Sequence, residues 1–187
     1  MLNSIIDIAI NAGNAILEIY NQDFEVEIKS DNSPLTLADK TANDIIVKGL
    51  QTLDNTIPII SEENKLIEYQ TRKNWTKCWM VDPLDGTTNF IHGLPLFCIS
   101  LALEYQGEIV VGIIHVPQLK QTYTALKNEG AYLNAQKISV STKTELKNAF
   151  VVSGFVNQSK NILAKQVVLL TTLETIILQV RQFDKII

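Results

Sequence analysis

The chain is poor in the residues that build zinc sites and in clustered positive charge. Its 187 residues include two Cys and two His, and the formal net charge is −4. The two Cys and two His lie far apart in the sequence, without the closely spaced pairs of a typical four-coordinate zinc site. The absence of a basic block argues against a nucleic-acid polymer as the main partner, because clustered Lys and Arg bind backbone phosphates.

Long apolar runs are also missing, and no stretch of the sequence is long enough to span a bilayer. Asp7, together with the lack of any Lys or Arg before Lys29, argues against a signal peptide. Cys78 and Cys98 each lie inside an apolar run, which favours buried free thiols in a reducing compartment. These features predict a cytoplasmic protein with no membrane partner. The 46% hydrophobic content is enough for one sizeable core.

Three common signatures of catalytic or ion-binding loops are absent too. The chain has neither the Gly-x-x-x-x-Gly-Lys-Ser/Thr phosphate loop nor the Gly-x-Ser-x-Gly nucleophile elbow. An EF-hand loop spaces its first acids two residues apart, whereas Asp82 and Asp85 are three apart. The chemistry must therefore come from another arrangement of the acidic residues.

The most informative segment is residues 82–88, in which Asp82 and Asp85 flank a proline and a leucine. It follows the apolar run 78–81, which predicts a buried strand. We therefore expect both carboxylates where this strand stops and the backbone turns. The alternative is a plain surface turn, because Asp, Pro and Gly are all turn residues.

A glycine and two hydroxyl residues follow the second carboxylate. Gly86 lets the backbone approach a ligand closely. The amides of Gly86, Thr87 and Thr88 are then expected to face an anion, as at a helix N-terminus. Two hard oxygen ligands beside such an anion site indicate Mg²⁺ bridging a phosphate.

The periodicity of the chain predicts helices first and strands afterwards. Apolar residues at helical spacing predict the helices, and short apolar runs bounded by turn residues predict the strands. This order favours an α+β layered domain, in which two helices cover a mostly antiparallel sheet. We expect one domain at 1–148 and the start of a second at 149–187. The predicted helices are 4–21, 36–53 and 162–178, and the predicted strands are 57–60, 78–81, 98–105, 108–115, 121–127, 130–134 and 150–153.

Four segments together resemble the inositol monophosphatase family of lithium-sensitive, Mg²⁺-dependent phosphomonoesterases. They are residues 32–39, 60–63, 79–90 and 130–141, and their order and spacing agree with the family over residues 1 to about 155. The resemblance implies the layered α-β-α sugar-phosphatase fold, a small phosphorylated substrate and a homodimer as a candidate assembly.

The resemblance also implies roles for individual acidic residues. Glu62 and Asp82 are expected to hold one Mg²⁺ with the Leu84 carbonyl, and Asp82 and Asp85 to hold a second. Glu63 is expected either to contact these metal ligands without binding the ion itself or to bind a third metal ion. Carboxylates that share cations in this way neutralise a phosphate placed between them.

The remaining implied roles concern water and phosphate. Asp39 and Thr87 are expected to form a hydrogen-bonded pair that positions the attacking water and helps to deprotonate it. Asp85, Gly86, Thr87 and Thr88 are expected to line the substrate phosphate.

The sequence departs from the family in its second half. The family takes another metal-binding Asp from a downstream Trp-Asp pair, but after Asp85 the only Asp is Asp184, with no Trp before it. We therefore expect a truncated second half and a second metal that is short of a ligand.

Three functions remain open on these grounds. The first is hydrolysis of an inositol monophosphate, favoured by the segment 87–93. The second is the sister 3'(2'),5'-bisphosphate nucleotidase activity on adenosine bisphosphate, favoured by 31–36 with 61–63. The third is an inactive or weakly active remnant that binds metal or phosphate only.

Overall fold

The computed structural model describes residues 1–22, 25–28, 34–64, 67–142 and 144–145. Its helices and strands lie in one compact unit, Met1–Ile138, and Ser139–Ile187 form a second unit. The predicted strand at 150–153, the predicted helix at 162–178 and the domain boundary at 148 lie outside the described residues and stay predictions. No helix in the described part is long and apolar enough to cross a membrane.

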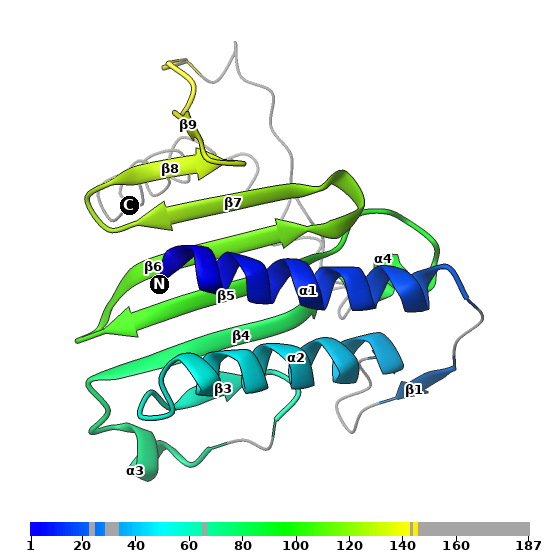
Figure 1. The fold of residues 1–187 in the computed structure, drawn as a ribbon, viewed down its shortest axis with the longest axis horizontal. Coiled ribbons are helices and arrows are strands. Elements are labelled where there is room, and N and C mark those ends of the chain that lie inside the picture. The colour runs from blue at the N-terminus through cyan, green and yellow to red at the C-terminus, as the bar shows by residue number, and fades with distance from the viewer. Residues whose placement is uncertain (23–24, 29–33, 65–66, 143, 146–187) are drawn as a thin grey trace. The chain divides into compact units, whose positions relative to one another are not determined.

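The two long helices of Met1–Ile138 precede the large sheet in the chain, as predicted, but two short strands lie between them and two short helices lie between strands (Figure 1). The helices are α1 (Leu2–Tyr20), α2 (Leu37–Leu53), α3 (Tyr69–Arg72) and α4 (Thr87–Ile91), with a 3₁₀ turn at Pro117–Leu119. The strands are β1 (Val26–Ile28), β2 (Pro34–Thr36), β3 (Ile59–Ser61), β4 (Lys77–Asp85), β5 (Cys98–Tyr105), β6 (Glu108–Val116), β7 (Gln121–Leu126), β8 (Gly130–Leu133) and β9 (Gln136–Ile138).

The strands of this unit form a small hairpin and one large sheet. β1 pairs with β2, and the large sheet runs in the order β3-β4-β5-β6-β7-β8-β9. Only the β3–β4 pair is parallel, and every other neighbouring pair is antiparallel. The prediction of an α+β fold with a mostly antiparallel sheet is therefore confirmed.

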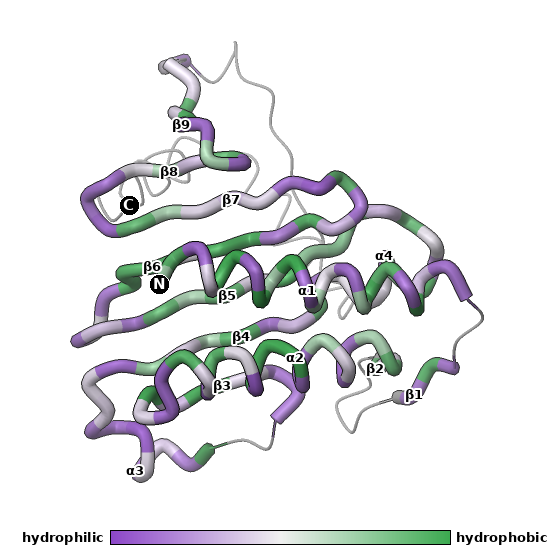
Figure 2. The backbone as a smooth tube through the Cα atoms, in the orientation of Figure 1, coloured by the Kyte–Doolittle hydropathy of each residue, from purple (hydrophilic) through white to green (hydrophobic). Residues whose placement is uncertain are grey.

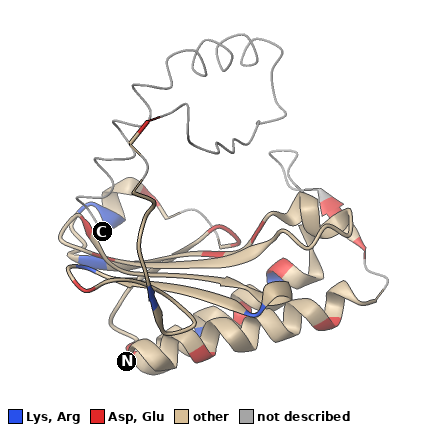
Figure 3. Ribbon diagram, turned by 90° about the horizontal axis from the view of Figure 1, so that it is seen from above, with Lys and Arg blue, Asp and Glu red and all other residues tan. Residues whose placement is uncertain are grey.

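Helices α1 and α2 lie side by side on one face of the large sheet (Figure 1). Each has an apolar stripe that packs on the central strands, and Figure 2 shows hydrophobic segments recurring along both helices and along β5 and β6. The acidic residues of α1, Asp7 and Glu18, are exposed, and Figure 3 shows acidic patches of this helix turned away from the sheet. Burial of one stripe per helix is what orients both helices.

Two glycines allow the helices to approach their neighbours closely. A Cβ at Gly49 of α2 would lie 2.7 Å from Ile8 of α1. A Cβ at Gly13 of α1 would lie 2.7 Å from Cδ2 of His115 on β6. The His115 ring is buried, and its Nδ1 lies 2.9 Å from Thr122 Oγ1. The ring therefore has little room to move away from α1.

We expect Gly13→Ala to destabilise the protein by about 1–2 kcal/mol. Overpacking costs about 1–3 kcal/mol, and a 2.7 Å contact with a fixed ring belongs in the upper half of that range. The better helix propensity of alanine offsets roughly 1 kcal/mol of this cost. Urea denaturation measures the change. Gly112→Ala is the control, because a Cβ at that position meets nothing within 4 Å. A Gly13→Ala protein as stable as the wild type would contradict this account of the α1–β6 contact.

The structure corrects one sequence expectation directly. We predicted that the strand at 78–81 stops before Asp82, but β4 continues through Asp85. Its antiparallel partner β5 still pairs with Asp82 and Asp85, so the strand does not end where the apolar run ends. Elements too short to show a period were not predicted: β2, β9, α3 and α4. β1 lies in the polar segment 23–33, for which an edge strand and a loop were both open.

Candidate active site

An irregularity in β4 brings the two aspartates to the same face of the sheet. Asp82 pairs with Ser100 and Asp85 pairs with Cys98, so three steps along β4 match two steps along β5. In a regular strand, residues three apart point to opposite faces. The extra residue of this bulge, next to the donor-less Pro83, restores a common face for both carboxylates.

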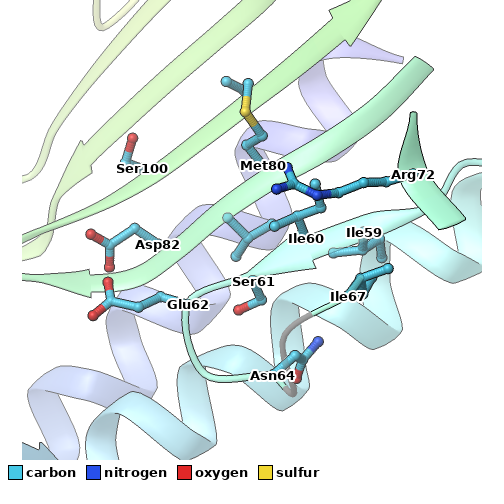
Figure 4. Close-up of a pocket in the computed structure, with 12 residues that line it drawn as sticks. Ile59, Ile60, Ser61, Glu62, Asn64, Ile67, Arg72, Met80, Asp82 and Ser100 are labelled. Atoms are coloured by element: carbon cyan, nitrogen blue, oxygen red, sulfur yellow. The ribbon is translucent and has the colours of Figure 1, made fainter. Parts of the chain in front are cut away.

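Glu62 joins this pair because β3 runs parallel to β4. Ser61 pairs with Val81, and the Glu62 N–H donates to the Val81 carbonyl at 3.1 Å. Glu62 thus leaves the end of β3 beside Asp82, and Figure 4 shows their carboxylates pointing toward each other. The predicted proximity of Glu62 and Asp82 is present in the structure.

Negative charge accumulates at this end of β4. Burial, followed by the charges of Glu62, Asp85 and Glu63, raises the pKa of Asp82 to about 7, although the Leu84 N–H donates to its Oδ1 at 3.2 Å. A bound cation counteracts such repulsion, so the donor set suits a hard divalent ion.

These carboxylates do not form a closed metal cage. In the described part of the chain, no three His, Cys, Asp or Glu side chains gather closely enough to enclose an ion. Mg²⁺ does not require such a cage, because it usually keeps several waters and binds through one or two carboxylates and the substrate phosphate. The residues present therefore fit Mg²⁺ held mainly by Glu62 and Asp82.

Asp39 and Thr87 lie close together although they belong to different helices, α2 and α4. Asp39 is 1% exposed, and its Oδ1 lies 3.0 Å from Thr87 Oγ1. The other oxygen, Oδ2, accepts from the Thr36 amide at 2.7 Å and the Thr36 hydroxyl at 2.6 Å, which completes a capping box on α2. Thr87 Oγ1 also lies 3.0 Å from the Leu84 carbonyl oxygen. Since a hydroxyl has one hydrogen, it donates to one of these acceptors at a time.

The turn after β4 depends on a glycine. Gly86 has a φ of 92°, and a Cβ there would lie 2.9 Å from the Leu96 carbonyl oxygen. Gly86 is the N-cap of α4, so the first amides of this short helix follow it directly. Thr87 is half-buried and Thr88 is exposed at this end of the helix. The turn and the start of α4 lie directly after Asp85, and the binding of a phosphate by the amides of residues 86–88 stays a prediction.

The structure also places residues that the sequence did not single out for the site. Cys98 was expected to be fully buried, but it is half-buried beside Asp85, with 3.8 Å between Sγ and Oδ2. Burial, and then the charges of Asp85 and Asp82, raise the pKa of this thiol to about 11. Only the pairing of β4 with β5 indicates this position, because no local motif marks it. His92 is exposed, as expected for a surface position.

Comparison with known proteins agrees with the residues gathered here. A model of the Inositol monophosphatase family matches residues 1–182. The chain belongs to the inositol monophosphatase family. It is 40% identical over 131 residues to the 3'(2'),5'-bisphosphate nucleotidase CysQ of Salmonella typhimurium, covering 69% of this chain and 53% of the relative.

Other family members share the sequence and the fold. The inositol-1-monophosphatase of Mesorhizobium japonicum is 34% identical over 156 residues, which covers 82% of this chain and 58% of the relative. The crystal structure of the suppressor protein suhB from Bartonella henselae superposes with a TM-score of 0.70 at 33% identity, covering 76% of this chain and 55% of that one. The chain thus spans about half the length of the relatives it matches, and their names differ in substrate.

Proposed function

We propose that this protein hydrolyses a small phosphomonoester with Mg²⁺ as cofactor. The observation that carries the proposal is the bulge in β4, because it turns Asp82 and Asp85 to one face beside Glu62. The Asp39–Thr87 contact next to that face supplies a group that can accept a proton. Family membership supports the same reaction class.

The chain's own residues define the proposed mechanism. Glu62 and Asp82, with the Leu84 carbonyl, would hold one Mg²⁺, and Asp82 and Asp85 would hold a second. When bound, such ions would neutralise phosphate charge and acidify water. The amides at 86–88 orient the phosphate oxygens.

Thr87 and Asp39, a residue of α2, would position the attacking water. Thr87 Oγ1 accepts a hydrogen bond from the attacking water while donating its own hydrogen to Asp39 Oδ1. As the water attacks, its proton passes to Thr87 Oγ1 and the Thr87 hydroxyl proton passes to Asp39 Oδ1. Two hydrogen bonds from Thr36 to Oδ2 hold the Asp39 carboxylate in position for this transfer. Glu63, which is half-buried next to Glu62, acts behind the ligands.

Two substrates compete within this proposal. An inositol monophosphate is our first choice, and adenosine 3',5'-bisphosphate is the second. Relatives named for each are similar to this chain. The proposed setting is the cytoplasm, and a homodimer stays a prediction.

Phosphate release from inositol 1-phosphate and from adenosine 3',5'-bisphosphate tests the proposal. We expect release that requires Mg²⁺, stops when EDTA removes the metal and is inhibited by Li⁺. EDTA-resistant release would contradict the metal-dependent mechanism. No release from a folded sample would favour the alternative of a remnant that binds metal or phosphate only. That alternative draws on the half-length coverage of the relatives.

A further inference from the structure

The candidate active site is part of a larger cavity, and the carboxylates of Glu62 and Asp82 line only one end of it. The cavity has a volume of about 570 Å³, which is within the range of small-molecule sites. Glu62 and Asp82 line one part of it, and Figure 4 shows Ile60 and Met80 beside them along the two parallel strands. A substrate whose phosphate binds at the carboxylates therefore extends over this apolar wall.

A guanidinium lies over the same wall. Arg72, the last residue of α3, lines the cavity together with Ile60, Ile67 and Met80. Figure 4 shows its side chain crossing above Ile60 toward Met80. Among the described residues that line the cavity, Arg72 is the one basic residue. The cavity thus combines a carboxylate end, an apolar wall and one fixed positive charge.

The positive charge of Arg72 is available for a ligand. Among the described residues, no carboxylate lies within 4.0 Å of its guanidinium, whose central carbon stacks 5.8 Å from the centre of the Tyr69 ring. Cation–π stacking orients a guanidinium while leaving its N–H donors unused. Those donors match the oxygens of a phosphate in a bidentate arrangement.

The spacing suits a second anionic group on the same molecule. Met80 and Asp82 are two residues apart on one strand face, which is roughly 7 Å. A guanidinium at Met80 is thus separated from the carboxylate end by about the width of a sugar ring with its substituents. We propose that Arg72 binds a second phosphate of the substrate and so selects bisphosphorylated over monophosphorylated molecules. This inference rests on the proposed phosphatase function and, within it, favours a bisphosphorylated substrate over the inositol monophosphate that the sequence suggests first.

Matched substrate pairs test the role of Arg72 in the full chain. Adenosine 3',5'-bisphosphate is compared with adenosine 3'-monophosphate, and inositol 1,4-bisphosphate with inositol 1-phosphate. We expect Arg72→Met to raise KM for a bisphosphate about 10- to 100-fold, the loss typical of charge-assisted hydrogen bonds, with kcat nearly unchanged. KM and kcat for the matching monophosphate should stay the same. Arg72→Lys should raise KM for the bisphosphate by less than Arg72→Met, because lysine keeps the positive charge but lacks the paired N–H donors of the guanidinium.

Lys73→Met is the control for overall charge, because Lys73 is the neighbouring exposed cation and does not line the cavity. A bisphosphate-specific rise in KM that is seen with only one of the two pairs also supports the proposal. It then shows whether the substrate is a nucleotide or an inositol phosphate. Equal effects of Arg72→Met on both members of each pair, or equal effects of Lys73→Met, would overturn it.

A binding measurement separates this inference from the proposed function. Calorimetry measures binding of each bisphosphate, in the presence of Mg²⁺, to an Asp39→Asn protein and to the same protein carrying Arg72→Met. If the wild type hydrolyses neither pair, the phosphatase proposal fails. Bisphosphate binding that weakens with Arg72→Met still supports the subsite, whereas absent or unchanged binding overturns it.

Discussion

Asp82→Asn is expected to abolish Mg²⁺-dependent phosphate release while raising the thermal stability of the metal-free protein. Asp82 is the central acid of the candidate site, so its loss should lower kcat on the order of a thousandfold. The expected gain in stability has a separate cause. The pKa of Asp82 rises to about 7 through burial and the nearby negative charges, led by Glu62. Asparagine removes the unfavourable charge and keeps an oxygen that accepts from the Leu84 N–H.

The sign of the stability effect follows from linkage. A carboxyl whose pKa is higher in the folded than in the unfolded state destabilises the folded state once it ionises. The stability gap between Asp82→Asn and the wild type should therefore open above about pH 4 and be complete above about pH 7. Thermal unfolding in EDTA at several pH values measures it.

Mg²⁺ provides the matching control for the Asp82 prediction. Addition of Mg²⁺ should raise the midpoint of thermal unfolding of the wild type, because the ion binds the folded state. The same addition should raise the midpoint of Asp82→Asn much less. Asp7→Asn carries the same change of charge on the exposed side of α1 and should behave like the wild type. An Asp82→Asn protein with wild-type phosphate release would remove Asp82 from the proposed metal site.

Phe90→Ala is expected to cost about 3–5 kcal/mol of stability and to impair the candidate site as well. Phe90 is fully buried in α4. Its ring lies 5.2 Å from that of Tyr20 at the end of α1 and 5.3 Å from that of Phe97 before β5, and the Tyr20 and Phe97 rings are 5.1 Å apart. A five-residue helix is not stable by itself, so this cluster holds α4 and with it Thr87.

Urea denaturation measures the loss, and phosphate release follows its consequence at the site. Phe90→Leu keeps most of the apolar volume and should lose clearly less than Phe90→Ala. Leu94→Ala is the control outside the cluster, because Leu94 is 49% exposed. A Phe90→Ala protein within about 1 kcal/mol of the wild type would show that α4 is held by other contacts.

Local sequence patterns were sufficient for the long elements. The apolar spacing of Ile5, Ile8 and Ile16 predicted α1, and all three residues are buried. Thr36 marked the start of α2 and is its N-cap. The Gln106-Gly107 pair predicted the hairpin between β5 and β6. Such signals are local, because helix caps, hairpin turns and apolar stripes depend on residues a few positions apart.

Short elements gave no comparable signal. α3 and α4 span one turn or little more, and β1, β2 and β9 have three residues each. A period of 3.6 or 2 cannot be recognised over so few positions. Their formation depends on tertiary packing, as the aromatic cluster around Phe90 illustrates.

The sequence by itself determined the family and the residue types of the candidate site: the acids at 39, 62, 82 and 85 and the glycine and hydroxyls after them. Only the tertiary structure decided how these residues meet. Strand alternation alone would set Asp82 and Asp85 on opposite faces, and it is the pairing of β4 with β5 that makes the bulge. Asp39 and Thr87 are 48 residues apart and meet only because the fold brings the first turns of α2 and α4 together. Contacts between distant segments are set by burial over the whole domain, which no local pattern encodes.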